Sequence, residues 1–308
     1  MRRVRSLLAQ CTPLKSTWHG ARFAFFRVLL GISPVLLSQV RFRLAWKRWP
    51  DFRRPKTFDE KLLWLNLYWR HPLKPVCGDK YTLRGYVEGQ GLGHLLPYLY
   101  GVYESVEEID FRALPESGVL KCSHGCKCNI FWRQKINLDV NAARRDLARW
   151  MRTDYSRFFG ELHYAEMKPR IICEELLNDG RGELPVDYKL YCFNGSVKCT
   201  LVCVGRQPNG KGKVYFYDND WHYLRYIKHE GPPVYNIEPP SSYTAMIVAA
   251  EKLARPFPFV RVDFYDIGGR PVLGEMTFTD SACINAGLTE EAQYELGANL
   301  ALPFNSVL

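Results

Sequence analysis

Two short runs near the C-terminal end, joined by a turn with two glycines, alternate in the way that is typical of a β-hairpin: Val260–Phe264 and Leu273–Thr277. Alternation along the first run places Arg261 and Asp263 on one face. A hairpin would bring Glu275 back beside Asp263. Two carboxylates next to a cation, on rigid strands, suit a hard divalent metal together with phosphate oxygens. Taken alone, the same pattern also fits an exposed hairpin with ordinary surface charges.

Further charged residues lie on strand-like runs upstream of this hairpin. Lys121 lies near the end of one run, Glu174 lies on a second, and Asp187 and Lys189 are two residues apart on a third. Lysines on separate strands can hold nucleotide phosphates, and carboxylates can hold a Mg²⁺ ion that bridges those phosphates. These runs are otherwise too apolar for solvent on both faces, so we predict that the charges gather at one site.

The positive charge of the chain is concentrated at its N-terminus. Residues 1–54 contain 12 Lys or Arg and one acidic residue, whereas the rest of the chain contains 30 basic and 31 acidic residues. A neutral body argues against a nucleic-acid groove, which needs cations across the binding face. A basic N-terminal segment instead favours contact with an anionic surface.

The same N-terminal segment mixes basic with aromatic and aliphatic side chains, as interfacial membrane segments do. Its longest uncharged run, Val28–Val40, has 13 residues, whereas a membrane-spanning helix needs about 20. We therefore predict peripheral contact between residues 1–50 and an anionic membrane surface. The alternative is a helical cap that packs on the rest of the protein.

Ten cysteines at irregular spacings do not suggest a disulfide framework in a chain of 308 residues. We therefore expect reduced thiols and a cytoplasmic location. Four of the possible soft ligands lie close together in sequence, and they are Cys122, His124, Cys126 and Cys128. Their spacing is not a regular zinc spacing, so the pattern is only weak support for a metal site.

Local signals also indicate the class of fold. Thr57 and Glu60 form a capping box at the start of a helix. Asn194–Gly195 is a strong hairpin turn between two strands, and Lys213–Tyr217 continues the meander. Long β-meanders mixed with helices, without regular βαβ alternation, predict an α+β fold rather than a doubly wound sheet.

Taken in order, these residues resemble the ATP-grasp superfamily, and most of all its teichuronopeptide-synthesis-type (TupA-like) family. The resemblance covers roughly residues 35–285. It is carried by these segments: Pro55–Lys61, Asp79–Tyr81, Val119–Gly125 with Asn129, Lys168–Ile172 with Glu174–Glu175, Asp187–Lys189, Phe193–Gly195, Phe216–Asp218 with Asp220–Trp221, Phe257–Asp263 and Gly274–Thr279.

The resemblance implies an ATP-grasp fold of the α+β class, in which two subdomains clamp ATP. The expected divisions are a basic amphipathic segment at residues 1–54 and an N-terminal α/β region at residues 55–115. A nucleotide lid at residues 116–178 and a metal and substrate subdomain at residues 179–308 would follow.

The resemblance also implies roles for residues that would bind the nucleotide. Lys121 and Lys189 would contact the phosphates, and Lys189 would also stabilise the transferring phosphoryl group. Glu174 and the backbone at Glu175–Leu176 would read the adenine. Asp187, beside Lys189, completes this set.

Further implied roles concern the metal and the chemistry. Asp263, Glu275 and Thr277 would hold Mg²⁺, and Thr277 stands where many ATP-grasp enzymes carry Asn. Arg261 would face the carboxylate substrate or its acyl phosphate. His124 is a candidate general base. Two departures from the family concern neighbouring segments: Cys126–Cys128 replaces small residues over the phosphates, and Asp280–Ile284 lacks the expected glycines.

The implied chemistry is an ATP-dependent ligation of a carboxylate to an amine through an acyl phosphate. The setting of the family implies an amino acid as amine donor and a uronic acid or polyglutamate carboxylate of a cell-surface polysaccharide, such as a capsule, as acceptor. A carboxylate-bearing glycan or lipid-linked saccharide at the inner face of the membrane would suit the basic N-terminus. We expect no nucleic-acid partner.

Two other functions remain open on sequence alone. Asp218 and Asp220 form a D-x-D pattern, with which a nucleotide-sugar glycosyltransferase of the same pathway would hold a metal. The same three residues are ordinary turn chemistry. The third hypothesis is a degenerate ATP-grasp scaffold that binds a partner at the membrane.

Overall fold

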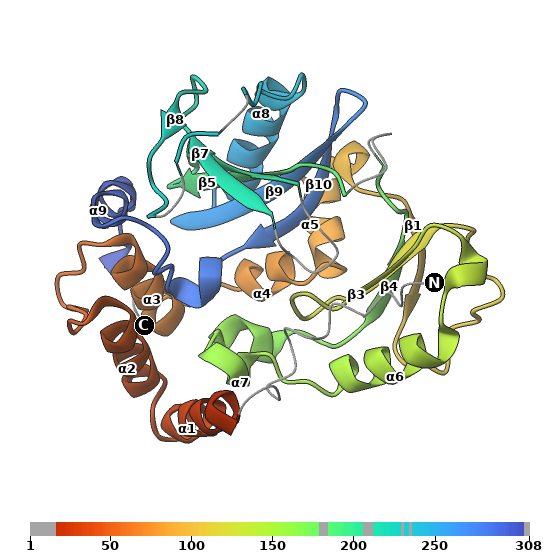
Figure 1. Cartoon of the computed structure of the whole chain (residues 1–308), viewed down its shortest axis with the longest axis horizontal. Helices are drawn as coiled ribbons and strands as arrows, with labels where there is room; N and C mark the ends of the chain where they lie inside the picture. Colours follow the sequence, from red (N-terminus) through yellow and green to blue (C-terminus); the bar gives the residue numbers. More distant parts are fainter. Residues whose placement is uncertain (1–16, 179–183, 206–211, 229–230, 234–235, 305–308) are drawn as a thin grey trace.

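The computed structural model describes residues 17–178, 184–205, 212–228, 231–233 and 236–304 (Figure 1). Its α-helices are α1 (Thr17–Ile32), α2 (Pro34–Trp46), α3 (Phe58–Tyr68), α4 (Leu73–Gly78), α5 (Thr82–Gly89), α6 (Val140–Met151), α7 (Ser156–Phe159), α8 (Tyr243–Ala254) and α9 (Glu290–Asn299). Its strands are β1 (Leu99–Tyr103), β2 (Gly118–Cys122), β3 (Asn129–Trp132), β4 (Ile171–Glu174), β5 (Asp187–Phe193), β6 (Ser196–Val204), β7 (Lys213–Tyr217), β8 (Tyr223–Leu224), β9 (Phe259–Ile267) and β10 (Arg270–Thr277). Its 3-10 helices are η2 (Gly93–Leu95), η3 (Lys135–Asn137), η4 (Leu162–Glu166) and η5 (Asp280–Cys283).

The larger sheet has six strands in the order β10-β9-β5-β6-β7-β8, and its neighbouring strands are antiparallel. Helix α8 packs on one face, where Tyr243 and Thr200 share a hydrogen bond of 2.9 Å (Figure 1). Phe58, the first residue of α3, packs on the other face, with its ring 5.1 Å from that of Phe259. Helices α8 and α3 thus cover the two faces of this sheet, which agrees with strands that are apolar along most of their length.

A bulge sets the register of the β9–β10 hairpin. Two glycines form the turn with φ of 61° and 80°. The pairing then skips Gly274, so that Glu275 lies opposite Asp263, which confirms the predicted neighbours. Without the bulge, regular alternation would place Glu275 opposite Val262 and on the other face of the sheet. The Asn194–Gly195 turn between β5 and β6 also forms as predicted.

The smaller sheet has four strands in the order β1-β4-β2-β3, again with antiparallel neighbours. Leu120 and Cys173 lie on its apolar face and belong to one core with Leu147 and Trp150 of α6. Lys121 and Glu174 therefore project from the opposite face, because successive side chains alternate.

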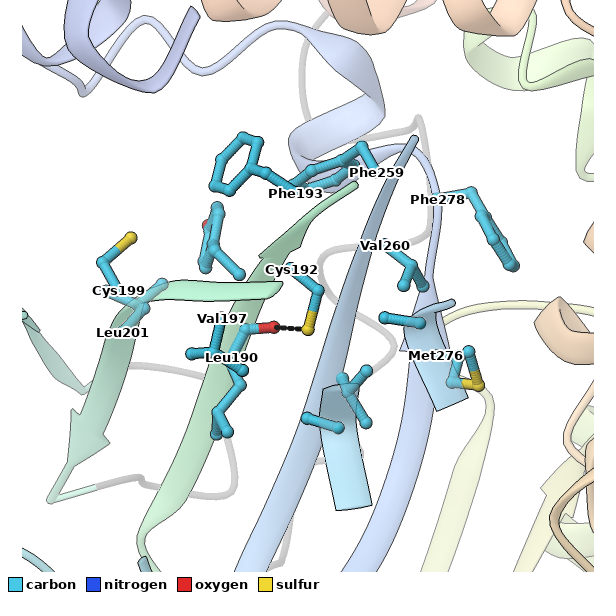
Figure 2. Packing of buried hydrophobic residues seen from close by; sticks show 14 of the residues in the cluster. Leu190, Cys192, Phe193, Val197, Cys199, Leu201, Phe259, Val260, Met276 and Phe278 are labelled. Atoms are coloured by element: carbon cyan, nitrogen blue, oxygen red, sulfur yellow. Dashed lines mark hydrogen bonds between the residues drawn. The ribbon is translucent and has the colours of Figure 1, made fainter. Parts of the chain in front are cut away.

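Buried thiols fill gaps in the core of the larger sheet, as Figure 2 shows for Cys192 and Cys199. The Cys192 Sγ donates a weak hydrogen bond of 3.7 Å to the Leu190 carbonyl oxygen. No disulfide joins any two of the nine cysteines in the described part of the chain. The buried thiols among them act as small hydrophobes.

The N-terminal segment forms a helical hairpin where it is described, and residues 1–16 lie outside the described residues. Phe26 and Leu29 of α1 pack against Leu37 of α2. Arg41 of α2 ties this hairpin to the body, because its guanidinium donates to the carbonyl oxygens of Phe159 and Ala282 at 2.7 and 2.9 Å. Within the described residues, no helix combines the length and the apolar character that crossing a bilayer requires.

Candidate active site

A cluster of charged side chains occupies one face of β5, β9 and β10 in the larger sheet. The Lys189 Nζ lies 2.7 Å from Asp187 Oδ2 and 2.5 Å from Asp263 Oδ2. The Arg261 Nε lies 2.7 Å from Asp263 Oδ1, and its Nη2 lies 2.8 Å from Asp263 Oδ2. Both oxygens of Asp263 are thus held by two cations that come from neighbouring strands.

Arg261 also joins this centre to β10 and to the turn that follows. Its Nη2 lies 3.2 Å from Thr277 Oγ1 and 3.4 Å from Glu275 Oε1. Its Nη1 donates to the Asp280 carboxylate. The cluster therefore contains two cations and four carboxylates, which leaves a formal net charge of −2 when all six groups are ionised.

The neighbours of these buried groups keep them ionised. Burial alone would raise the pKa of Asp263, but Arg261 and Lys189 outweigh it and hold this pKa at about 2. Burial alone would lower the pKa of Lys189, but Asp187 and Asp263 raise it instead. At neutral pH Asp263 and Lys189 are therefore fixed charges rather than a proton reservoir.

The 3-10 turn η5 brings Asp280 to Arg261 through a strained backbone. Ser281, Ala282 and Cys283 have φ of 51°, 53° and 66°, in the left-handed region that favours glycine. Each such residue costs about 1 kcal/mol or more. The surrounding contacts must offset this cost, and one of them is the hydrogen bond from Arg41 to the Ala282 carbonyl oxygen. Sequence reasoning missed Asp280, although the missing glycines had marked this segment as unusual.

A second charged group lies on the polar face of the smaller sheet. The Lys121 Nζ lies 2.7 Å from Glu174 Oε2, and Arg84 Nη1 of α5 lies 3.1 Å from Glu174 Oε1. The Glu175 N–H donates to the Tyr98 carbonyl oxygen at 3.0 Å, which continues the pairing of β4 with the chain before β1. Arg84 was missed because it is 90 residues from Glu174 in sequence.

The structure therefore separates the expected site residues into groups. Lys121, Glu174, Glu175 and Leu176 belong to the smaller sheet or its extension. The larger sheet carries the metal and phosphate candidates, and these are Asp187, Lys189, Arg261, Asp263, Glu275 and Thr277.

His124 lies in neither group. It is buried in the turn after β2, with its ring 5.4 Å from the ring of Tyr155. Burial lowers its pKa, so the imidazole is neutral at pH 7. Asp79 and Lys80 are the charged groups that affect this pKa most. Its role as a general base stays a prediction.

The loop after β2 is held closely by its neighbours. The Lys80 Nζ donates to the Gly125 carbonyl oxygen at 2.5 Å, and Ser123 Oγ donates to Asp79 Oδ2 at 2.6 Å. A Cβ at Gly125 would lie only 2.5 Å from the Tyr155 ring, so this position requires glycine. Lys127 has a φ of 58°, which gives the loop a left-handed kink.

The carboxylate of Asp218, in the D-x-D pattern, accepts hydrogen bonds within its own turn. Its Oδ1 accepts from the backbone N–H groups of Asp220 and His222 at 3.0 and 2.8 Å. Its Oδ2 lies 3.1 Å from His222 Nδ1. These contacts are those of an aspartate-capped turn between β7 and β8.

The oxygen donors of the larger sheet fit a magnesium ion that also binds a ligand. Among the described residues, no three His, Cys, Asp or Glu side chains are grouped so that they could hold a metal by themselves. Mg²⁺ typically takes one or two carboxylates and completes its shell with phosphate oxygens and water. Asp263 and Glu275 supply such carboxylates, and the net charge of −2 suits a dication. The Cys122–Cys128 loop forms no such group either.

The family model described as TupA-like ATPgrasp matches residues 60–301. No match was found among curated proteins. Among solved structures, the chain is similar to a D-alanine–D-alanine ligase from Bacillus anthracis, with 12% identity over 73% of this chain and 67% of that chain and a TM-score of 0.42. It is also similar to an L-amino acid ligase from Bacillus licheniformis, with 12% identity over 81% of this chain and 49% of that chain and a TM-score of 0.44.

Proposed function

The chain belongs to the TupA-like ATP-grasp family, so it is an ATP- and Mg²⁺-dependent ligase, and from that premise we propose that it joins a carboxylate to an amine through an acyl phosphate. The observation that carries this proposal is the buried cluster in which Asp263 binds both Lys189 and Arg261. Such a cluster can bind a metal and phosphates while it stays ionised at neutral pH.

The proposed roles of the residues follow from where they lie. Asp263 and Glu275, with Thr277 beside them, would hold Mg²⁺, which neutralises phosphate charge when it is bound. Lys189 would leave Asp263 for the phosphates as the metal takes its place, because the metal supplies the positive charge that the carboxylate needs. Arg261 stays paired with Asp280 and orients the carboxylate substrate.

The nucleotide would lie between the proposed lid, residues 116–178, and the proposed metal subdomain, residues 179–308. Lys121 would contact phosphates from the lid side. Glu174 and the backbone at Glu175–Leu176 would read the adenine, and Arg84 would fix the Glu174 carboxylate for that purpose. His124 is the proposed base for the attacking amine.

We propose a carboxylate-bearing glycan or lipid-linked saccharide as acceptor and an amino acid as amine donor, within surface-polysaccharide synthesis at the inner face of the membrane. The glycosyltransferase alternative receives no support from the geometry of its D-x-D. The Asp218 carboxylate already accepts hydrogen bonds from its own turn.

ATP·Mg²⁺ is expected to raise the melting temperature of the protein, because a ligand that binds only the native state stabilises it by mass action. At 100 times its Kd, this stabilisation is about 2.7 kcal/mol. The Lys189→Ala variant should lose the shift, because the Nζ that would contact phosphate is removed. Thermal unfolding with and without ATP·Mg²⁺ measures both effects.

The matched control is Lys213→Ala, which removes an exposed lysine from β7 of the same sheet. This variant should keep the full ATP·Mg²⁺ shift. A UDP-sugar is tested in parallel. A shift with the UDP-sugar alone, or an unchanged ATP·Mg²⁺ shift in Lys189→Ala, would contradict the proposed nucleotide site.

We further propose that α1 is the part of the chain that meets an anionic membrane. Phe25, Val28 and Ile32 are spaced by three and four residues, so they share one face of the helix. Their exposed fractions are 50%, 61% and 69%. Arg27 is exposed beside them, and the net charge of +11 over residues 1–54 complements anionic lipid.

Replacing Val28 and Ile32 together by Ser should weaken binding to anionic vesicles about tenfold or more, because each exposed aliphatic side chain gains about 1 kcal/mol or more on burial. Co-sedimentation with phosphatidylglycerol vesicles measures this change. Val248→Ser, at a valine of α8 that is 63% exposed, is the matched control and should bind normally. Equal binding of the double variant and wild type would rule out this face.

A further inference from the structure

A separate cavity of about 320 Å³ lies where α3, α4 and η4 meet. Its lining is rich in groups that bind charged ligands, and these include Trp69, Arg70, His71, Lys74, His163 and Glu166. None of these residues has a role in the nucleotide or metal site. The volume is at the lower end of the range for small-molecule pockets, so it would hold a compact ligand.

Lys74 is the most unusual residue of this cavity. Its exposed fraction is 5%, and its ammonium lies 5.8 Å from the centre of the Trp69 ring. Its ammonium makes no hydrogen bond or ion pair with the described residues, whereas its backbone N–H donates to the His71 carbonyl oxygen at 2.9 Å. The Lys74 side chain is buried while its ammonium reaches the cavity without an anionic partner, and lysines are almost never buried in this way without one. An anion in the cavity would supply that partner.

The other lining groups define what kind of anion would fit. His163 is buried, and its pKa is lowered well below the ordinary value, first by burial and then by Lys74. It is therefore neutral, and its Nδ1 has no hydrogen-bond partner among the described residues. Glu166 is exposed and also lines the cavity, and its charge raises the pKa of Lys74, so this carboxylate lies near the Lys74 ammonium without forming an ion pair with it. A positive group inside and a negative group at the rim complement a zwitterion.

We propose that this cavity binds a free α-amino acid, with the amino acid carboxylate on Lys74 and its ammonium towards Glu166. This proposal rests on the proposed function in one respect, namely that the bound amino acid is the amine donor of the ligation. The aromatic rings of Trp69 and His71, stacked with centroids 5.2 Å apart, form the apolar part of the wall.

The cavity is connected to the charged cluster through η4 and η5. Glu161, directly before η4, accepts a hydrogen bond of 2.6 Å from Thr279 Oγ1. Thr279 precedes Asp280, which binds Arg261. Glu161 is also near enough to Lys74 for its charge to raise the pKa of that lysine. An amino acid bound to Lys74 would therefore lie close to Glu161, and a single hydrogen bond joins Glu161 to the residue before the strained turn.

Isothermal calorimetry tests the proposal with the intact protein and a panel of amino acids: glycine, both enantiomers of alanine, L-glutamate and the remaining common amino acids. At least one of them should bind, and Lys74→Met should weaken its Kd about 10- to 100-fold, the effect of losing a charged hydrogen bond. Glu166→Gln, at an exposed position where the fold is not at risk, should weaken it up to about fivefold. Lys198→Met, at an exposed lysine of β6, is the control and should leave the Kd unchanged.

Two further ligands, inorganic phosphate and acetate, distinguish a site for a zwitterion from a site for any anion. Both carry negative charge and no ammonium group. If they bind as tightly as the amino acid and with the same dependence on Lys74, the site is an anion site and the proposal is overturned. It is also overturned if no amino acid in the panel binds, or if Lys74→Met and Lys198→Met bind equally well.

The pH dependence gives an independent readout. The pKa of Lys74 is lowered to about 8, chiefly by burial; Arg70 adds to this lowering, whereas Cys283, Glu161 and Glu166 oppose it. His71 and His163 line the same cavity and are kept neutral by burial. Affinity for the carboxylate should therefore fall as pH rises through about 8, and Lys74→Met should abolish this fall. A flat profile in wild type would count against a carboxylate on Lys74.

The two proposals can fail separately. If the amino acid binds through Lys74 but ATP·Mg²⁺ does not bind, the cavity is supported and the ligase mechanism is wrong. If ADP is released with an amino acid whose KM is the same in wild type and Lys74→Met, the ligase mechanism is supported and the cavity is not the donor site.

Discussion

Asp263→Asn is expected to reduce ATP-dependent ligation by about 1,000-fold or more, because one charge is lost from the carboxylate that binds Lys189 and Arg261 and that we propose as a metal ligand. Loss of a single preorganised electrostatic contact in an active site commonly costs 100- to 1,000-fold, or about 3–4 kcal/mol. Asp263 makes three such contacts: its Oδ1 accepts from Arg261 Nε, and its Oδ2 accepts from Arg261 Nη2 and from Lys189 Nζ. The variant should fold, because Lys189 retains its ion pair with Asp187 and Arg261 retains its ion pair with Asp280.

The measurement is ADP release with the substrates that wild type accepts, together with a Mg²⁺ titration at fixed ATP. The variant should need more Mg²⁺, because the carboxylate that we propose as a metal ligand has become a neutral amide. Asp218→Asn is the matched control and should keep near-normal activity. The reverse result, an active Asp263→Asn and an inactive Asp218→Asn, would contradict the proposed role of Asp263; a glycosyltransferase would instead release nucleotide from a UDP-sugar and depend on Asp218.

Phe58→Ala is expected to lower the free energy of unfolding by about 3–5 kcal/mol, the usual cost of removing a buried phenyl ring. The Phe58 ring is fully buried against Tyr191, Phe193 and Phe259, with centroids 6.1, 5.8 and 5.1 Å away. Its loss leaves a cavity where α3 joins the larger sheet, and backbone packing on both sides limits collapse. Urea-induced unfolding monitored by tryptophan fluorescence gives the change.

Phe25→Ala is the control for Phe58→Ala, because the Phe25 side chain is 50% exposed on α1. Its effect on stability should stay within about 1 kcal/mol. If Phe58→Ala cost no more than Phe25→Ala, the contact between α3 and the sheet would not be a main source of stability.

Much of the charged cluster could be predicted from sequence, because its strands alternate regularly and turns with two glycines are easily recognised. The bulge at Gly274 could not. A bulge depends on how two strands pair, so the sequence of one strand alone does not predict it. In this structure a Cβ at Gly274 would lie 3.0 Å from the Tyr265 ring, so the close approach explains why glycine stands there. The neighbours Asp263 and Glu275 were thus predicted without the feature that makes them neighbours.

The residues that sequence reasoning missed are those that reach the site from irregular or distant segments. Asp280 arrives through a left-handed turn without glycine, and no local propensity favours such a turn. Arg84 lies on helix α5, and the spacing of apolar residues along a helix does not predict which strand an Arg on that helix will contact. Lys74, which lines the separate cavity and not this site, lies on α4, a helix of six residues that was not predicted at all. Short helices have too few turns to show an apolar period.

The contact between Arg41 and η5 has a consequence for how the N-terminal region can be studied. Arg41 holds the Ala282 carbonyl oxygen, and the next residue, Phe42, is fully buried in the main core. Removing residues 1–50 would therefore open the turn that presents Asp280 to Arg261. The boundary between the proposed lipid-contacting helix and the part of the N-terminal region that supports η5 therefore falls inside the hairpin, between α1 and α2.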